Sequence, residues 1–490
     1  MLNTMRYLIL PVLNAAGPVF MWFAGMMLVP LGVAIAYDPD VVQSFVVSTL
    51  ITFLIGLFLT LSTRAQRREL TARHGFLLVT LIWTCVPLLS TIPFLIVMPS
   101  MSFSQLYFEM MSCLTTTGAT VMTGLDHLPL SLNGWRCFLS WLGGMGLIVL
   151  SVAILPLLGI GGAQVIKAET SGPLKEQKLT PRIADTAKAL WMIYFGISVA
   201  CAIAYHMSGM EWSDAIMHMM TTVSLSGIST HDSSYAFFNS ARVDYVAVFF
   251  MALCGFNFSL HFLAWNRRNI FLYFKDPEAL TWILMLILLC VITFVVLWQQ
   301  SVYSNWEDNL RFALFSVVSV ASTTGFSDTD YSSWPLGLPV LILIASAYST
   351  CGGSTGGGIK ALRLLILART LKRELMLLLY PKASVPLRVG QTIIDNKISF
   401  AVLVYVMVWI LTAIVGMILL LISGLDTTEA LSAPLAMLSN LGPGLGNVGP
   451  IGNFSYLSDT QLWICSFLML IGRLEIFTVF VLFTKNFWRI

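Results

Sequence analysis

Four short stretches of the chain place hydroxyl or amide residues just before a glycine. They read TTTG (115–118), SLSG (224–227), STTG (322–325) and SNLG (439–442). A ring of backbone carbonyls can replace the hydration shell of an alkali cation. Glycine suits such a ring because it reaches backbone angles that other residues avoid, so successive carbonyls can point to one axis. The four stretches therefore predict a cation site built from backbone oxygens.

A second glycine-rich stretch, YSTCGGSTGGGIK at 348–360, resembles a phosphate-binding loop only superficially. Ile359 separates the last glycine from Lys360, and Ala361 stands where a hydroxyl should follow. Apolar runs flank the stretch, so we predict that residues 351–358 are the unwound middle of a membrane helix, crossing the pore below the carbonyls as a movable gate. A tight helix-packing patch, the alternative, explains two or three of the glycines but not five. The predicted gate residues are Gly352, Gly353, Ser354, Thr355, Gly356, Gly357 and Gly358.

Arg473 lies midway along the apolar stretch WICSFLMLIGRLEIFTVFVLF. A charge there is costly unless it faces a cavity or a partner. We predict that Arg473 is a positive charge in the inner half of the pore, where it regulates cation passage and contacts the facing glycine loop. Pairing with Glu475 is the alternative, although residues two apart point to different helix faces. Lys360 and Arg363 are predicted to be ordinary positive-inside anchors, with a gating contact as the alternative.

The elements that would position these residues belong to a membrane protein. The sequence is 57% hydrophobic and 10% charged, and its mean hydropathy is +0.83, which is far from the composition of a soluble domain. A net charge of +3 without a dense basic patch argues against a nucleic-acid partner. The eight cysteines include no C-x-x-C pair and lie mostly in apolar runs, so we expect buried thiols and no disulfide framework.

Apolar runs of the length needed to cross a bilayer recur along the chain. Lys and Arg gather in alternate connections, which by the positive-inside rule predicts that both termini are cytoplasmic. The ten predicted crossings lie near residues 8–36, 41–63, 75–98, 134–160, 187–208, 243–266, 279–300, 336–377 (broken by the glycines), 396–424 and 460–487.

Between these crossings lie four shorter segments that cannot span a bilayer. Each begins with helix-starting residues and ends at one of the four glycines, which recur at intervals of about 100 residues and so indicate an internal repeat. A single such glycine would ordinarily mark only a helix end. Four half-spanning helices around an axis would instead form a pore, with their negative ends favouring a cation. The segments are 102–120, 211–230, 305–327 and 426–446, with starting pairs Ser102/Gln105, Ser213/Asp214, Asn305/Asp308 and Asp426/Glu429.

At this point the chain resembles the Trk/Ktr/HKT superfamily of potassium transporters, most closely its bacterial TrkH/TrkG branch. TTTGAT, STTGFSDTD, NLGPGLGNVGP, GGSTGGGIK and GRLEIFT carry the resemblance, which covers almost the whole chain. It implies one filter glycine per repeat, with K+ bound through the carbonyls of Thr117, Ser226, Thr324 and Leu441. The predicted filter is Thr116, Thr117, Gly118, Leu225, Ser226, Gly227, Thr323, Thr324, Gly325, Asn440, Leu441 and Gly442. The sequence has no G-Y-G and carries SLSG in the second repeat and Asn440, Leu441 and Pro443 in the fourth, so a looser selectivity is expected.

The fold expected is an all-α integral membrane protein with four pseudo-symmetric repeats of helix, pore helix and helix around a pore. Two extra transmembrane helices precede the repeats. The expected units are residues 1–70 for the helix pair, 71–165, 166–272 and 273–385 for the first three pore repeats, and 386–490 for the fourth.

The expected activity is potassium uptake across the bacterial inner membrane, down the electrochemical gradient and without an organic cofactor on this chain. The resemblance implies a homodimer and a cytosolic TrkA-type ring that binds NAD and adenine nucleotides. Proton- or sodium-coupled symport remains an alternative. A remote alternative is an intramembrane enzyme with Ser226 as nucleophile and His231 or His261 as base, although metal-ligand and protease motifs are absent from the sequence.

Overall fold

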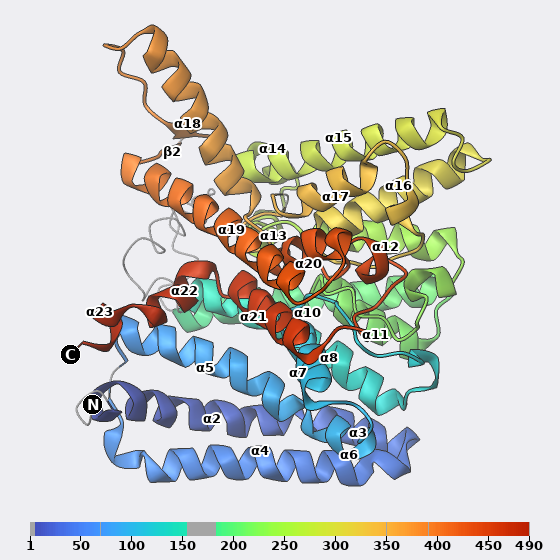
Figure 1. The fold of residues 1–490 in the computed structure, drawn as a ribbon, viewed down its shortest axis with the longest axis vertical. Helices are drawn as coiled ribbons and strands as arrows, with labels where there is room; N and C mark the ends of the chain where they lie inside the picture. Colours follow the sequence, from blue (N-terminus) through green and yellow to red (C-terminus); the bar gives the residue numbers. More distant parts are fainter. Residues whose placement is uncertain (1–4, 69, 154–182, 349, 391, 490) are drawn as a thin grey trace.

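The computed structural model describes residues 5–68, 70–153, 183–348, 350–390 and 392–489 (Figure 1). The unit boundary predicted at 165 lies outside these residues, as does the end of the crossing predicted at 134–160. The described chain is predominantly helical, which confirms the all-α membrane fold. Its one β element is a small antiparallel hairpin of β1 (Arg388–Val389) and β2 (Thr392–Ile393).

Six described segments are long and apolar enough to cross a membrane, and two bent helix pairs raise the number to as many as eight. These eight correspond to eight of the ten predicted crossings. The two others are α8 (Leu130–Ala153), which continues into residues that are not described, and 336–377, which is broken into two helices. The six segments are Arg6–Tyr37, Pro39–Ser62, Ala72–Val97, Ala187–Ser208, Pro277–Gln299 and Asn396–Ile422.

The first two crossings form a tightly packed antiparallel pair at one side of the molecule (Figure 1). The first consists of α2 (Leu10–Met26) and α3 (Leu28–Tyr37), and the second is α4 (Val42–Ser62). A Cβ on Gly17 would lie 2.8 Å from the Gly56 carbonyl oxygen, and a Cβ on Gly56 would lie 2.7 Å from that of Gly17. Small residues at this crossing let the two backbones approach, as is common between membrane helices.

The predicted half-spanning segments all contain a short helix. These are α7 (Phe103–Leu114), α11 (Trp212–Val223), α16 (Trp306–Ala321) and α20 (Thr427–Ser439). The capping box of Ser102 with Gln105 and the side-chain cap at Asp426 are confirmed. The start at Asn305 is confirmed, because Asn305 precedes α16 and its side-chain amide donates to Asp308 Oδ2 (3.3 Å), although it does not cap the helix. The start at Ser213 is wrong, because Glu211 precedes α11 and forms no side-chain cap.

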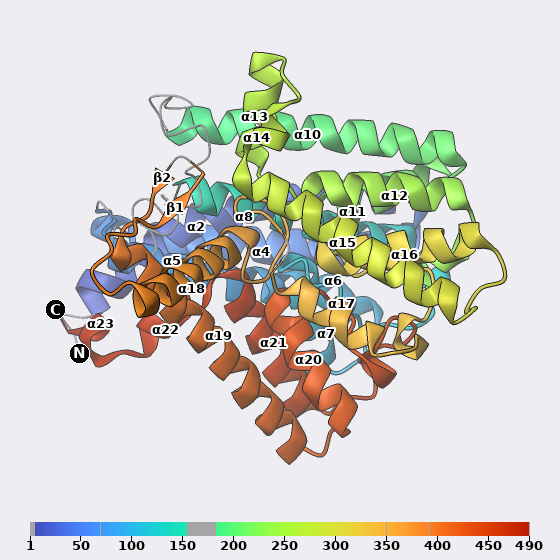
Figure 2. The ribbon, with the colours of Figure 1, turned by 90° about the horizontal axis from the view of Figure 1, so that it is seen from above.

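The remaining helices surround these short ones (Figures 1 and 2). Two pairs of consecutive helices meet at a sharp bend. The angle is 93° between α12 and α13, and 112° between α21 and the segment Ile476–Phe483 that begins with α22. Their bounds are α5 (Ala72–Ser90), α6 (Ile92–Val97), α10 (Ile183–Ser208), α12 (Ala241–Cys254), α13 (Phe258–Arg267), α14 (Leu272–Lys275), α15 (Pro277–Gln299), α17 (Leu338–Ser346), α18 (Ala361–Leu379), α19 (Asn396–Ile422), α21 (Asp459–Arg473), α22 (Ile476–Phe480) and α23 (Lys485–Trp488).

Candidate functional site

The four short helices end in the same way. In each, one amide bonds to the carbonyl three residues before it, and the next amide bonds to the carbonyl five residues before it, which is the Schellman arrangement. The second bonds are Thr117 N to Ser112 O (2.9 Å), Ser226 N to Thr221 O (2.9 Å), Thr324 N to Ser319 O (2.8 Å) and Leu441 N to Ala436 O (2.9 Å).

The residue at the turn of each arrangement is left-handed and is not glycine. The φ angles are 53° at Thr116, 55° at Leu225, 60° at Thr323 and 52° at Asn440. Asn tolerates this conformation, whereas a β-branched residue is strained in it. Such strain persists only where the surrounding structure enforces it, and it concentrates at functional sites.

The glycines follow two residues later, so ending the helix is not their role. All four are left-handed, with φ between 67° and 92°. A Cβ on Gly118 would lie 2.1 Å from Ser226 O, one on Gly227 2.1 Å from Thr324 O, and one on Gly325 2.1 Å from Leu441 O. A Cβ on Gly442 would lie 2.5 Å from Thr117 O, which closes the circle.

Each glycine therefore packs against the carbonyl that precedes the glycine of the next loop. All twelve predicted filter residues lie in this ring, and it brings together the carbonyls of Thr117, Ser226, Thr324 and Leu441. Each of these four residues has a left-handed residue on both sides, so the chain here is not an extended strand with alternating carbonyls. Hydroxyl bonds brace two loops, from Thr115 to Thr117 (2.8 Å) and from Ser322 to Thr324 (2.6 Å).

The glycine-rich loop crosses beneath the ring. The chain leaves α17 after Ser346 and becomes helical again at Ala361, so the unwound segment is longer than the predicted 351–358. Thr355 Oγ1 donates to Val223 O (3.0 Å), and Gly357 N donates to Thr323 Oγ1 (2.8 Å).

Two glycines of this loop lie against the ends of the short helices. A Cβ on Gly357 would lie 2.0 Å from Ser439 O, and one on Gly356 would lie 2.9 Å from Ser322 O. The loop thus contacts the carbonyl ends of three of the four short helices. It is also tied at its outer edge, where Gly352 N donates to Glu278 Oε1 (2.6 Å) and Phe258 N donates to Gly353 O (3.1 Å).

Arg473 is 2% exposed and contacts the loop as predicted. Its Nη1 donates to Thr355 O (2.9 Å), and its Nη2 donates to Gly143 O on α8 (3.3 Å). The alternative pairing with Glu475 is wrong, because Glu475 binds Arg363 Nη2 at 2.9 Å. Arg473 therefore bridges the glycine-rich loop to α8.

Lys360 and Arg363 are buried, so the prediction of ordinary anchors is wrong, and the alternative of a contact with the gate agrees with the position of Lys360. They are 8% and 2% exposed. Lys360 Nζ donates to Gly356 O within the loop, and the Arg363 guanidinium lies 3.9 Å from the Tyr405 ring centroid. Both cations fix the junction of the loop with α18, where the charge of each is partnered inside the protein.

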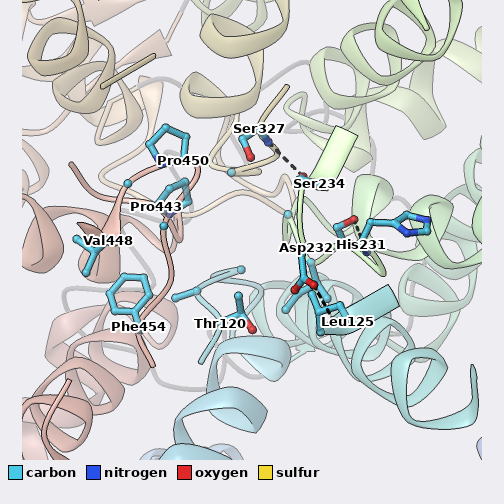
Figure 3. Close-up of a pocket in the computed structure, with 18 of the residues that line it drawn as sticks. Thr120, Leu125, His231, Asp232, Ser234, Ser327, Pro443, Val448, Pro450 and Phe454 are labelled. Atoms are coloured by element: carbon cyan, nitrogen blue, oxygen red, sulfur yellow. Dashed lines mark hydrogen bonds between the residues drawn. The ribbon is translucent and has the colours of Figure 1, made fainter. Parts of the chain in front are cut away.

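A hollow lies on the opposite side of the ring from the loop, lined by residues from all four repeats (Figure 3). Leu125 N donates to Asp232 Oδ2 (3.1 Å) and Ser327 N to Ser234 Oγ (3.3 Å), so neighbouring repeats are joined around it. His231 Nδ1 lies 2.6 Å from Asp126 Oδ1. Burial alone would lower the pKa of His231, but its hydrogen bonds with Asp214 and Asp126 raise it above its usual value.

The serine and histidines of the enzyme alternative do not form a catalytic pair. Ser226 Oγ donates to Thr221 O (3.5 Å). His231 faces Asp126, and His261 bonds to the Tyr273 hydroxyl (2.7 Å) and to Leu253 O (3.1 Å). Neither histidine is therefore hydrogen-bonded to Ser226, and each is held by a different partner.

Two charged residues near the site were missed by the sequence analysis. Arg136 is 1% exposed within α8, but it lies two residues after the start of the predicted crossing 134–160, where an arginine is common, so its signal is weaker than that of Arg473. Glu278 follows a proline at the start of α15 and reads as an ordinary first-turn acid, so no signal linked it to an amide 74 residues away.

Comparison with known proteins agrees with this architecture. The sequence model of the TrkH family, described as a cation transport protein, matches residues 41–490. The Trk system potassium uptake protein TrkH of Halomonas elongata is 42% identical over 98% of this chain and 99% of its own length. TrkG of Escherichia coli is 35% identical over 94% of this chain and 95% of its own.

A solved structure is also similar throughout. The crystal structure of the potassium transporter TrkH from Vibrio parahaemolyticus superposes with a TM-score of 0.91 at 39% identity, covering 98% of this chain and 100% of the other. The relatives are named as transport proteins and not as enzymes. This chain, a multi-pass membrane protein, belongs to the TrkH family of cation transport proteins.

Proposed function

We propose that this chain carries potassium into the cell through the ring of four glycine loops. The observation that carries the proposal is the closed circle in which each glycine packs against a carbonyl of the next loop. Four carbonyls held at one level offer neutral oxygen ligands that replace the water of an alkali cation. The names of the relatives, which are potassium uptake proteins, support potassium as that cation.

The electrostatics of the short helices favour a cation over an anion. Their carbonyl ends meet at the ring, and a helix carries partial negative charge at that end. The uncharged hydroxyls of Thr115, Ser322 and Thr324 add polarity without a strong anionic site. A cation can therefore bind there and still leave.

Passage is controlled below the ring. The glycine-rich loop lies against the helix ends that a cation must pass. Arg473, at the end of α21, places its positive charge against the same loop. The gate opens when the loop moves away from Val223 O and Ser439 O. This movement also breaks the hydrogen bond between Arg473 and Thr355 O. The cytoplasmic helix α18 follows the loop directly and gives a regulatory subunit a segment to displace.

The test is uptake of potassium and rubidium in a bacterial strain that lacks its own potassium systems. We expect uptake above the vector control, with potassium preferred over sodium. Absence of uptake by a well-expressed protein would reject the proposal. Reversal potentials in liposomes then separate a channel-like pathway from symport, because a symporter's reversal potential shifts with the proton or sodium gradient.

The setting that we propose is the bacterial inner membrane, with both termini in the cytoplasm and two copies of the chain per complex. Side-chain nitrogens of Arg73 and His74, at the start of α5, lie within hydrogen-bond distance of the Arg489 and Tyr7 carbonyls, which supports two termini on the same side of the membrane. A TrkA-type ring with bound nucleotide would supply regulation. Co-purification with and without NAD or adenine nucleotides tests this partner.

A further inference from the structure

A buried ion pair lies next to the loop of the ring that carries Gly118. We call the four loops of the ring, in sequence order, the first to fourth filter loops. Arg136 on α8 donates from Nε (2.9 Å) and Nη2 (2.7 Å) to Glu109 Oε1 on α7. The side chains are 1% and 0% exposed. A buried pair of this kind seldom adds much stability over apolar packing, so its presence raises the question of what it positions.

Glu109 holds the outer part of the first loop. Its Oε2 accepts from Val121 N (2.9 Å) and from Thr120 Oγ1 (3.0 Å). Thr120 and Val121 follow Gly118 by two and three residues. Because the acceptor is ionised, these bonds are stronger than neutral ones and fix the backbone that leads out of the ring.

Arg136 extends this support to the second loop. Its Nη1 donates to Ser229 O (3.2 Å), and Asn133 Oδ1 accepts from the same nitrogen (3.0 Å). Ser229 stands two residues after Gly227, as Thr120 stands two residues after Gly118. The guanidinium thus joins equivalent points of two neighbouring loops, directly behind the place where Gly118 packs against Ser226 O.

The other loops have a different support. In the second repeat, His218 takes the position of Glu109, nine residues before the glycine, and its Nε2 lies 3.0 Å from Ser229 Oγ. Ser316 and Ala433 take this position in the third and fourth repeats. Neither can form an ion pair at this position. The second and third repeats are joined by an ion pair elsewhere, between Arg311 Nε on α16 and Asp244 Oδ2 on α12 (3.5 Å).

We propose that Arg136, oriented by Glu109, is a positioning residue that sets the spacing of the first two filter loops and thereby the preference for potassium. The inference rests on the proposed function of the ring. A guanidinium is planar with donors in a fixed geometry, so it can hold Glu109 and Ser229 O at once, whereas a lysine ammonium offers a single point of contact. Ion preference should therefore depend on the arginine itself and not only on its charge.

The test is competition of sodium with rubidium uptake in Arg136→Lys, Arg136→Gln, Glu109→Gln and the Glu109→Gln/Arg136→Gln double variant. Arg242→Gln is the control, because Arg242 is an exposed arginine at the start of α12. We expect Arg136→Gln to lower the preference for rubidium over sodium by about 10-fold, the change given by ~1.4 kcal/mol of relative binding. Arg136→Lys and Glu109→Gln should lower it less, and the control should leave it unchanged.

The maximal rate and the half-saturating concentration are recorded separately, with gel filtration to score folding. The double variant should recover part of the preference lost in Arg136→Gln, since it leaves no unpaired buried charge. An unchanged ion preference in well-folded Arg136→Lys and Glu109→Gln overturns the inference even if Arg136→Gln fails to fold. Loss of uptake rate at constant preference overturns it too. A wild-type protein that does not prefer potassium would instead reject the proposed function.

Discussion

The ring of four loops and the glycine-rich loop beneath it use glycine for opposite purposes. In the ring, each glycine is fixed between a Schellman-terminated helix and the carbonyl of the next loop, and the pattern occurs four times. The loop beneath occurs once, and its bonds come from side chains on separate elements, among them Thr323, Glu278 and Arg473. The ring therefore fixes the distances between its carbonyl oxygens. We expect the glycine-rich loop to be able to replace its few side-chain hydrogen bonds by others when it moves.

This difference suggests a division of labour. The preference among cations should depend on the ring, where a small displacement changes every carbonyl distance. The rate of passage should depend on the loop, whose displacement leaves those distances intact. Variants in the two regions should therefore have separable effects. A loop variant that changes ion preference, or a ring variant that changes only the rate of passage, would contradict this separation.

The largest effect is expected at the ring glycines. Serine at Gly118, Gly227 or Gly325 would place a Cβ 2.1 Å from a carbonyl oxygen and would require a left-handed backbone, so we expect the potassium preference to fall by about 100-fold, or ~2.7 kcal/mol. Gly442→Ser should be milder, because its Cβ would lie 2.5 Å from Thr117 O. Sodium competition with rubidium uptake measures the preference.

A control separates backbone strain from contact. Gly124 is also left-handed, with φ of 73°, but a Cβ there would meet nothing within 4 Å. Gly124→Ser should therefore leave the ion preference unchanged. Equal effects at Gly118 and Gly124, or no effect at any ring glycine, would remove the ring as the selecting element.

The next largest effect concerns Arg473, where the loop and a positive charge meet. Arg473→Ala should raise potassium flux in liposomes by about 10-fold, because a charge within the membrane contributes a barrier of a few kcal/mol. Ion preference should change little. Arg473→Lys is the matched control, since it keeps the charge and should keep most of the barrier. Unchanged flux in the alanine variant, with normal insertion, would leave Arg473 with a purely structural role.

A smaller effect is expected within the loop itself. A Cβ on Gly357 would lie 2.0 Å from Ser439 O, so Gly357→Ala should push the loop away from α20 and change the open probability several-fold. Gly356→Ala should act in the same direction but less, because its nearest backbone neighbour, Ser322 O, would lie 2.9 Å away. Single-channel recording gives both open probability and ion preference.

Gly196→Ala serves as the control, since a Cβ at Gly196 on α10 would meet nothing within 4 Å. A change of ion preference in Gly357→Ala at unchanged open probability would contradict the separation of the two regions. In Gly357→Ala, the dependence of potassium flux on the proposed cytosolic partner should weaken. Deleting a few residues within 351–358 should also alter the open probability, because it shortens the loop.

Sequence alone was sufficient where the structural signal is local and repeated. The four short helices and their glycines follow from a repeated spacing. The break near 352–358 and the contact of Arg473 occur once, but each has a strong local signal: five glycines in seven positions, and a charge midway along an apolar run. The left-handed residues at Thr116, Leu225 and Thr323 were not predictable, because propensity disfavours them and only the packed ring enforces them.

The other misses have a long-range cause. Lys360 and Arg363 begin a stretch of sequence rich in basic residues and are therefore predicted to be positive-inside anchors, yet both side chains are buried where the unwound segment meets α18. Glu278 and Arg136 act on backbone groups 74 and 93 residues away. A pairing between a side chain and a distant amide or carbonyl leaves no periodic pattern in the sequence.

The smallest effect expected is at Glu278, which ties the outer edge of the loop to α15. Its Oε1 accepts from Gly352 N at 2.6 Å, and the side chain is 6% exposed. Glu278→Gln keeps an acceptor of the same shape but removes its charge, which should weaken the bond by about 1 kcal/mol. We expect the bond to hold the loop across the pathway and only part of its energy to differ between the two loop positions, so flux should rise about twofold, which is less than for Gly357→Ala, with ion preference unchanged. Glu307→Gln is the control, because Glu307 is an exposed first-turn acid on α16. A fall in flux would mean that the Glu278 bond stabilises the open arrangement instead, and a shift in sodium competition would place the tether with the ring and not with the loop.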